Sequence, residues 1–153
     1  MYPHIHLYVD IDKGLFMPQA YIAGPLFNEG ERWFDEQIER IAAEAGYTTF
    51  LPHRDGKEGK IKSEANIPAI FAEDVAAIDR ADIVIANLNG ITTDDGTAWE
   101  LGYAYAKGKH LIGVYTDWRL QYKFQVVNLI LECSLHKLVR SLDELRVYLQ
   151  DKA

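Results

Sequence analysis

The sequence predicts an α/β fold in which a parallel sheet carries helices on both of its faces. Segments of strand length alternate with amphipathic segments of helix length from Gln19 to the C-terminus. Residues 81–88 (ADIVIANL) are almost continuously apolar and β-branched, as is typical of a central parallel strand. The chain has 153 residues, 48% hydrophobic and 25% charged, which suits one folded domain. Right-handed crossovers make the flavodoxin-like strand order 2-1-3-4-5 the simplest topology for five such strands.

Each element has its own local signature along the chain. Strands are expected at residues 19–24, 47–52, 81–88, 110–117 and 136–140. Helices are expected at residues 31–46, 63–80, 96–107, 126–135 and 141–150. Asn28 and Glu31 have the spacing of a capping box at the start of the first helix, and Gly46 ends that helix. Residues 53–62 are polar and contain glycine, which predicts a loop.

The domain is expected to cover residues 17–153, preceded by an extension of residues 1–16. Within the extension, residues 5–9 alternate weakly and are read as a short strand or loop. The sequence shows no internal repeat, linker or low-complexity segment.

Composition and charge exclude several classes of function. The formal net charge is -7 without a dense Lys/Arg stripe, which argues against nucleic acid as a partner but not against a nucleoside or free base. No apolar run is long enough to span a membrane and no signal pattern is seen, so a cytoplasmic protein is expected. The single cysteine, Cys133, has apolar neighbours that predict a buried structural thiol. The five histidines are scattered, so no metal site is expected.

The fold rule places a ligand beyond the carboxyl ends of the strands, at the switch point between the first and third strands. This rule selects the loops AGPLFN, NGITTDDG and YTDWR, and the loop PHRDG lies at the same rim. The first loop contains Gly24 but lacks the GxGxxG pattern and the Lys and Ser/Thr of a P-loop. A dinucleotide or P-loop site is therefore not supported.

The carboxylate of Glu100 lies about one turn into the helix predicted at 96–107, which begins at this rim. Spacing alone favours a solvent-facing residue, but an ionised carboxylate at a helix N-terminus beside a ligand site suits nucleophilic or general-base work. Asp94 and Asp95 precede the helix, and one of them is expected to cap it while the other can face the rim.

Two further side chains have ordinary structural interpretations when each is taken alone. Asp74 lies next to a stripe of Phe71, Val75 and Ile78, which is expected to be the buried face of its helix. Tyr21 lies within the first strand, where a core tyrosine with a satisfied hydroxyl is the simplest reading.

The sequence contains no serine nucleophile elbow and no convincing Cys–His pair. What remains at the rim is carboxylates with aromatic residues, namely Tyr21, Phe27, Phe71 and Trp99. Aromatic faces beside carboxyl groups suit a flat heterocycle and a sugar, and glycosyl transfer needs an anionic partner at the anomeric carbon and an acid at the leaving group.

Four segments in this order resemble the nucleoside 2-deoxyribosyltransferase family, from Tyr21 to about Asn128. They are YIAGPLF, FAEDVAAI, DDGTAWELGYAYAKGK and VNLIL. The resemblance implies transfer of a 2-deoxyribosyl group between nucleobases, through a covalent ester on the enzyme and with overall retention of configuration. It implies nucleosides and nucleobases as partners, no cofactor or metal, and a homo-oligomer, dimer or higher, with shared active sites.

The resemblance also assigns roles to individual residues. It implies that Glu100 is the nucleophile, that Tyr21 orients it, and that Asp74 is a proton donor near the departing base. It implies that Asp94 lines the substrate pocket and that Asn128 holds the sugar 5′-hydroxyl in a neighbouring subunit's site. Further candidate substrate contacts are Gly24, Phe27 and Phe71. The chain departs from the family pattern in its C-terminal LQDKA, where some members end in a tyrosine, and in residues 1–16.

Two other functions remain open from the sequence. One is hydrolysis of the N-glycosidic bond of deoxynucleosides or their 5′-monophosphates, but the monophosphate branch of the family places a serine where Asp94 stands. A phosphate about 4 Å from an ionised Asp94 would be repelled by roughly 4 kcal/mol per unit charge, unless a cation such as Arg119 compensates. The other is a non-catalytic nucleotide-binding module, which the combination of site residues makes the least favoured.

Overall fold

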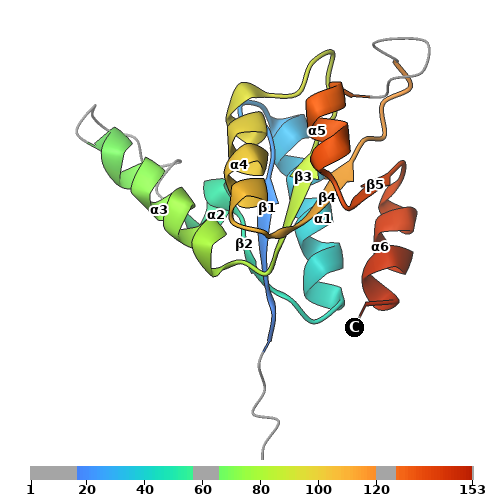
Figure 1. Cartoon of the computed structure of the whole chain (residues 1–153), viewed down its shortest axis with the longest axis horizontal. Helices are drawn as coiled ribbons and strands as arrows, with labels where there is room; N and C mark the ends of the chain where they lie inside the picture. The colour runs from blue at the N-terminus through green and yellow to red at the C-terminus, as the bar shows by residue number, and fades with distance from the viewer. Residues whose placement is uncertain (1–16, 57–65, 120–126, 153) are drawn as a thin grey trace, which may run out of the picture.

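A computed structural model describes residues 17–56, 66–119 and 127–152. The interpretations made for residues 1–16, for the latter part of the 53–62 loop and for residues 63–65 lie outside the described residues, wholly or in part. The five strands are β1 (Gln19–Ala23), β2 (Thr48–Phe50), β3 (Ile83–Asn87), β4 (His110–Val114) and β5 (Lys137–Val139). They form one parallel sheet of order β2-β1-β3-β4-β5, which confirms the predicted topology (Figure 1).

Helices cover both faces of this sheet and divide its core into two layers. The helices are α1 (Glu29–Glu44), α2 (Pro52–Asp55), α3 (Ile67–Arg80), α4 (Asp95–Ala106), α5 (Leu129–Ser134) and α6 (Leu142–Gln150). One layer of buried side chains joins α1 and α6 to the sheet, and the other joins α3 and α4 to the opposite face (Figure 1).

The alternation of β1 decides which layer each of its side chains enters. Ala20 and Ile22 belong to the α1 and α6 layer, whereas Tyr21 and Ala23 belong to the α3 and α4 layer. Successive residues of a strand point to opposite faces. The sequence of β1 therefore directs the Tyr21 side chain toward α4.

The helix ends follow the predicted capping chemistry. The Asn28 side chain accepts a hydrogen bond from Glu31 N (3.0 Å), and Glu31 Oε2 accepts one from Asn28 N (3.1 Å), so the capping box is confirmed. Gly46 has φ +90°, a left-handed conformation that glycine adopts without strain just after the helix. No helix among the described residues is long and apolar enough to cross a bilayer.

Two local expectations were wrong. The start of the 53–62 loop belongs to the short helix α2, because Pro52 suits a first helical turn and Asp55 Oδ2 accepts a hydrogen bond from Leu51 N (2.9 Å). Cys133 is exposed rather than buried. Leu131 and Leu135 of the α5 region pack against the core, and Cys133, about 200° around the helix from Leu131, faces outward.

Candidate active site

The side chains of Tyr21 and Glu100 meet on the face of the sheet that α3 and α4 cover. The Tyr21 hydroxyl donates a 2.5 Å hydrogen bond to Glu100 Oε1, across 79 residues of sequence. The Tyr21 ring is fully buried and stacks on Phe50 at 5.7 Å, so its position is fixed by the sheet and its neighbours. Glu100 is half-buried, and its side chain is directed toward the sheet. Spacing alone had favoured a solvent-facing residue at this position.

Two features of this pair favour the charged form of the Glu100 carboxyl. A phenol donates to it, and hydrogen bonds to a charged carboxylate are stronger than bonds between neutral groups. The carboxylate also lies within the early turns of α4, whose N-terminal end carries a partial positive charge. A carboxylate held in this way has the properties of a nucleophile or a general base.

Asp94 is the residue that caps α4. Its Oδ2 accepts hydrogen bonds from Thr97 N (2.8 Å) and from Thr97 Oγ1 (3.0 Å), while Asp95 is exposed in the first helical turn. The prediction that one of the two aspartates caps the helix is therefore confirmed. Asp94 and Glu100 are carried by the same helix, so the cap fixes the end of the element that presents Glu100.

Asp74 lies on α3, a helix that packs against α4. Its side chain is half-buried, and its Oδ1 atom is shielded from solvent. The expectation that Phe71 belongs to the buried face of α3 was wrong, because Ile70, Ala77 and Ile78 are the buried residues. Phe71 is 56% exposed, since it stands one residue, or about 100°, away from Ile70 around the helix.

Phe71 instead begins a row of aromatic side chains between α3 and α4. Its ring lies 5.3 Å from that of Trp99 and tilts against it, and Trp99 stacks on Tyr103 at 5.4 Å. Both Phe71 and Trp99 keep about half of their surface exposed. The row therefore presents flat apolar faces on the same side of the sheet as the Tyr21–Glu100 pair.

The remaining candidates lie in the segments that precede α1 and α5. Phe27 is 75% exposed in the loop before α1. Asn128 is exposed at the N-cap of α5, where its Oδ1 accepts a hydrogen bond from Ile130 N (2.9 Å). Gly24 directly follows β1, and a Cβ added to it would lie 2.5 Å from Oδ1 of Asp35.

Asp35 is a buried carboxylate that the sequence reasoning missed. It is 2% exposed on α1, and its Oδ1 accepts a hydrogen bond from Asn87 Nδ2 (2.8 Å) at the end of β3. Burial raises the pKa of Asp35 to about 7, while the bond from Asn87 acts to lower that pKa. Its position was a usable signal, because residues 35, 38 and 42 have helical spacing and Ile38 and Ala42 are buried.

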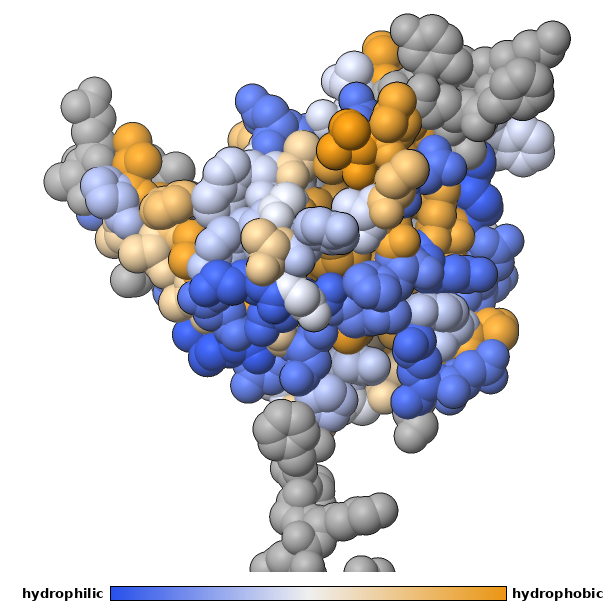
Figure 2. Space-filling view, in the orientation of Figure 1, coloured by the Kyte–Doolittle hydropathy of each residue, from blue (hydrophilic) through white to orange (hydrophobic). Residues whose placement is uncertain are grey.

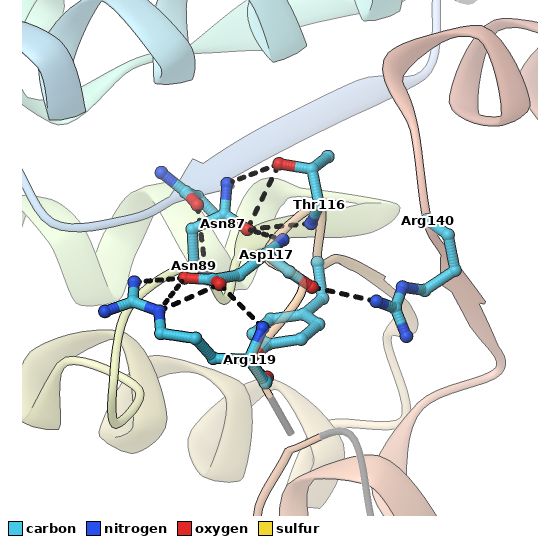
Figure 3. Close-up of polar contacts among 7 residues, drawn as sticks. Asn87, Asn89, Thr116, Asp117, Arg119 and Arg140 are labelled. Atoms are coloured by element: carbon cyan, nitrogen blue, oxygen red, sulfur yellow. Dashed lines mark hydrogen bonds and ion pairs between the residues drawn. The ribbon is translucent and has the colours of Figure 1, made fainter. Parts of the chain in front are cut away.

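A hydrogen-bond network extends from Asn87 along the loops after β3 and β4 (Figure 3). Asn87 Oδ1 accepts from Asn89 N (3.1 Å), and Asn89 Oδ1 accepts from Thr116 N (2.7 Å) and Asp117 N (3.2 Å). Arg119 then forms an ion pair with Asp117, which holds the pKa of that carboxyl well below its usual range (Figure 3).

Within the described residues, no group of three His, Cys, Asp or Glu side chains is arranged to hold a metal ion. The described histidines instead contact other protein groups. His53 Nε2 lies 3.3 Å from Glu36 Oε1, His110 Nε2 lies 2.9 Å from the Tyr148 hydroxyl, and His136 Nδ1 accepts from Leu111 N (3.0 Å).

Comparison with known proteins shows the family to which the chain is related. Residues 20–136 match the family model described as nucleoside 2-deoxyribosyltransferase. An uncharacterized protein of Ureaplasma parvum is 30% identical over 130 residues, spanning 74% of this chain and 80% of that protein.

Two solved structures are also similar. A conserved protein from Enterococcus faecalis is 26% identical with a TM-score of 0.77, over 90% of this chain and 99% of that one. The 2-deoxyribosyltransferase from Bacillus psychrosaccharolyticus is 27% identical with a TM-score of 0.72, over 84% of this chain and 90% of that one.

Proposed function

The chain belongs to the nucleoside 2-deoxyribosyltransferase family, and from this premise we propose that it transfers the 2-deoxyribosyl group between nucleobases. Family and structural neighbours support an enzyme of the deoxyribosyltransferase or related N-glycosidase kind. The observation that carries the proposal is the hydrogen bond between the Tyr21 hydroxyl and Glu100, because it holds a carboxylate at the ligand-binding rim of the sheet. The reaction belongs to nucleotide salvage in the cytoplasm.

The reaction proceeds in two displacements. A carboxylate oxygen of Glu100 forms a bond to C1′ of the deoxynucleoside while the C1′–N bond breaks, and its electron pair leaves with the base. Asp74 supplies the proton that neutralises the departing base. A second base then attacks C1′, its nitrogen displaces Glu100 from the ester, and its proton passes to Asp74. Two inversions at C1′ give overall retention.

The surrounding groups suit a sugar and a flat heterocycle. Asp94, held as the cap of α4, lines the substrate pocket, and Asn128 of a neighbouring subunit holds the sugar 5′-hydroxyl. Phe71 contributes an aromatic face for the base, and Gly24 and Phe27 line the approach from the first loop. Arg119 is ion-paired with Asp117, which supports an uncharged 5′-hydroxyl over a phosphate.

A homo-oligomer with shared sites is part of the same proposal. Exposed apolar side chains gather on α4 and α5, where Tyr105, Leu129 and Ile130 are 56–70% exposed. Figure 2 shows hydrophobic surface over the α5 region, above a hydrophilic lower half of the molecule. A second copy covering this surface would bring the cap of α5, Asn128, to a subunit boundary.

The test is base exchange between deoxyinosine and free adenine, with deoxyadenosine as the measured product. Glu100→Gln should abolish the exchange, whereas Asp95→Asn, which makes the same chemical change at an exposed site on the same helix, should retain it. Mass spectrometry of the protein with deoxyinosine alone should show the mass of one added deoxyribosyl group. Full exchange by Glu100→Gln would overturn the assignment of the nucleophile.

The same assay separates transfer from hydrolysis. A transferase releases hypoxanthine faster when adenine is present, because the acceptor base resolves the ester. Release of hypoxanthine and free deoxyribose at a rate independent of adenine would instead identify a hydrolase.

A further inference from the structure

A carboxylate is buried behind the candidate site, on the α1 side of the sheet. Asp35 of α1 lies against the ends of both β1 and β3, the two strands that flank the switch point. It meets β3 through Asn87 Nδ2, 2.8 Å from Oδ1. It meets the end of β1 at Gly24, where an added Cβ would lie 2.5 Å from Oδ1 and 2.7 Å from Oδ2. This carboxylate therefore fits a space that only a glycine at position 24 leaves open.

Each contact of Asp35 leads to a part of the candidate site. Gly24 stands three residues after Tyr21, whose hydroxyl holds Glu100. Asn87 stands at the start of the loop that ends at Asp94, the cap of α4. Asn87 also accepts from Asn89 N, and this bond shapes the first turn of that loop (Figure 3).

We propose that Asp35 is a positioning residue, whose ionised carboxylate fixes the loops after β1 and β3 and thereby sets the geometry of Tyr21, Glu100 and Asp94. The effect of Asp35 on catalysis rests on the proposed function. Its effect on the structure of the two loops rests on its contacts with Gly24 and Asn87. Asp35 itself lies on the opposite face of the sheet from Tyr21 and acts through its neighbours.

The ionised form is the one that positions the loops. A carboxylate accepts the hydrogen bond from Asn87 Nδ2 with its charge, and such bonds are about twice as strong as neutral ones. Protonation adds a hydrogen to a group that already fills the space beside Gly24. The charged groups that act on Asp35 are Glu31 and Glu36 of its own helix and Asp94 across the rim, and all three raise its pKa. Because that pKa is about 7, the two forms exchange near neutral pH.

The first test compares pH profiles of base exchange. Asp35→Asn keeps a carbonyl oxygen for Asn87 but cannot ionise. At pH 8 its kcat should fall roughly tenfold below that of the wild type with little change in KM, and below pH 6 the two kcat values should converge. Glu29→Gln, which removes an exposed charge from the same helix, should keep the wild-type profile. A wild-type profile in Asp35→Asn would overturn the proposal.

The second test is a double-mutant cycle with Gly24→Ala. Gly24 has no positive φ, so a methyl group there conflicts chiefly with the Asp35 carboxylate. Gly24→Ala should lower kcat roughly tenfold in the wild-type background and less than twofold in an Asp35→Ala background. An equal loss in both backgrounds would overturn the proposal, because the effect of the added methyl group would then not depend on the Asp35 carboxylate.

A third measurement does not depend on activity. Backbone amide NMR signals of residues 88–94 should shift between pH 6 and 8 in the wild type, with a midpoint near the Asp35 pKa of about 7, and should stay constant in Asp35→Asn. If the wild-type protein does not exchange bases between deoxyinosine and adenine, the proposed function alone is rejected. Loop signals that titrate identically in both proteins would reject the role of Asp35 alone.

Discussion

At the scale of single residues, the candidate site depends on one hydrogen bond between groups 79 residues apart in the chain. Tyr21 is fully buried, so its hydroxyl must find a partner inside the fold. Glu100 is the partner, and the bond aims its carboxylate at the rim. Two side chains that each have an ordinary structural interpretation form the candidate catalytic pair only when both are in place.

Tyr21→Phe removes this hydroxyl and keeps the ring that stacks on Phe50. A hydrogen bond to a charged group contributes about 1.5–3 kcal/mol, so kcat should fall roughly 10- to 100-fold. Tyr103→Phe is a matched control, because it also removes a phenol–carboxylate bond, between Tyr103 and Asp79 (2.9 Å), from the exposed surface of α4. Equal activity of the two variants would show that Tyr21 does not orient the nucleophile.

Asp35 also makes stability depend on pH. Its pKa is about 7 in the folded protein and 3.8 as an unperturbed group, so the folded state binds the proton more tightly. The resulting stability is fully present below pH 4 and is lost as pH rises through 7. The free energy of unfolding of the wild type relative to Asp35→Asn should therefore fall by about 2–4 kcal/mol between pH 4 and 8, measured by urea denaturation. A difference independent of pH would contradict the burial of an ionisable group.

At the scale of elements, the first turns of α4 carry both the residue that caps the helix and the candidate nucleophile. Asp94 caps it through Thr97, and Glu100 follows within the early turns. The cap needs only a side-chain oxygen, whereas a strong hydrogen bond to substrate and the repulsion of a phosphate depend on the charge of Asp94.

Two substitutions separate these roles of Asp94. Asp94→Asn should keep the cap and change the free energy of unfolding by less than about 0.5 kcal/mol, while Asp94→Ala should lower it by about 1 kcal/mol. Both variants should raise KM for deoxyinosine. Thermal unfolding and steady-state kinetics measure the two effects, and a normal KM in Asp94→Asn would remove this residue from the substrate pocket.

At the scale of the whole molecule, apolar side chains are exposed on α4 and α5, and Figure 2 shows the hydrophobic surface over the α5 region. Ile130→Glu would place a charge in a subunit contact and should shift the protein to a smaller species with loss of exchange. Val147→Glu places the same charge at an exposed apolar residue of α6, and it should change neither the size of the species nor the rate of base exchange. Sedimentation velocity measures the species, and an unchanged size for Ile130→Glu would place the contact elsewhere.

The sequence by itself determined the order and type of the elements and hence the sheet topology, because strand and helix periodicities are local and right-handed crossovers leave few arrangements. It also placed either Asp94 or Asp95 at the cap of a helix and Glu100 about one turn into that helix, since capping and spacing are read along the chain. The expectation that Phe71 belongs to the buried face of α3 was wrong for a physical reason, because one position around α3 separates its core face from the face that meets Trp99.

Only the tertiary structure decided which side chains meet. The contact of Tyr21 with Glu100 and that of Asp35 with Asn87 join separate elements across the sheet, and such pairings depend on strand order, register and the face that each residue enters. The raised pKa of Asp35 was decided in the same way. Its helical spacing was visible in the chain, but its desolvation and its fit beside Gly24 exist only once α1 packs across the ends of β1 and β3.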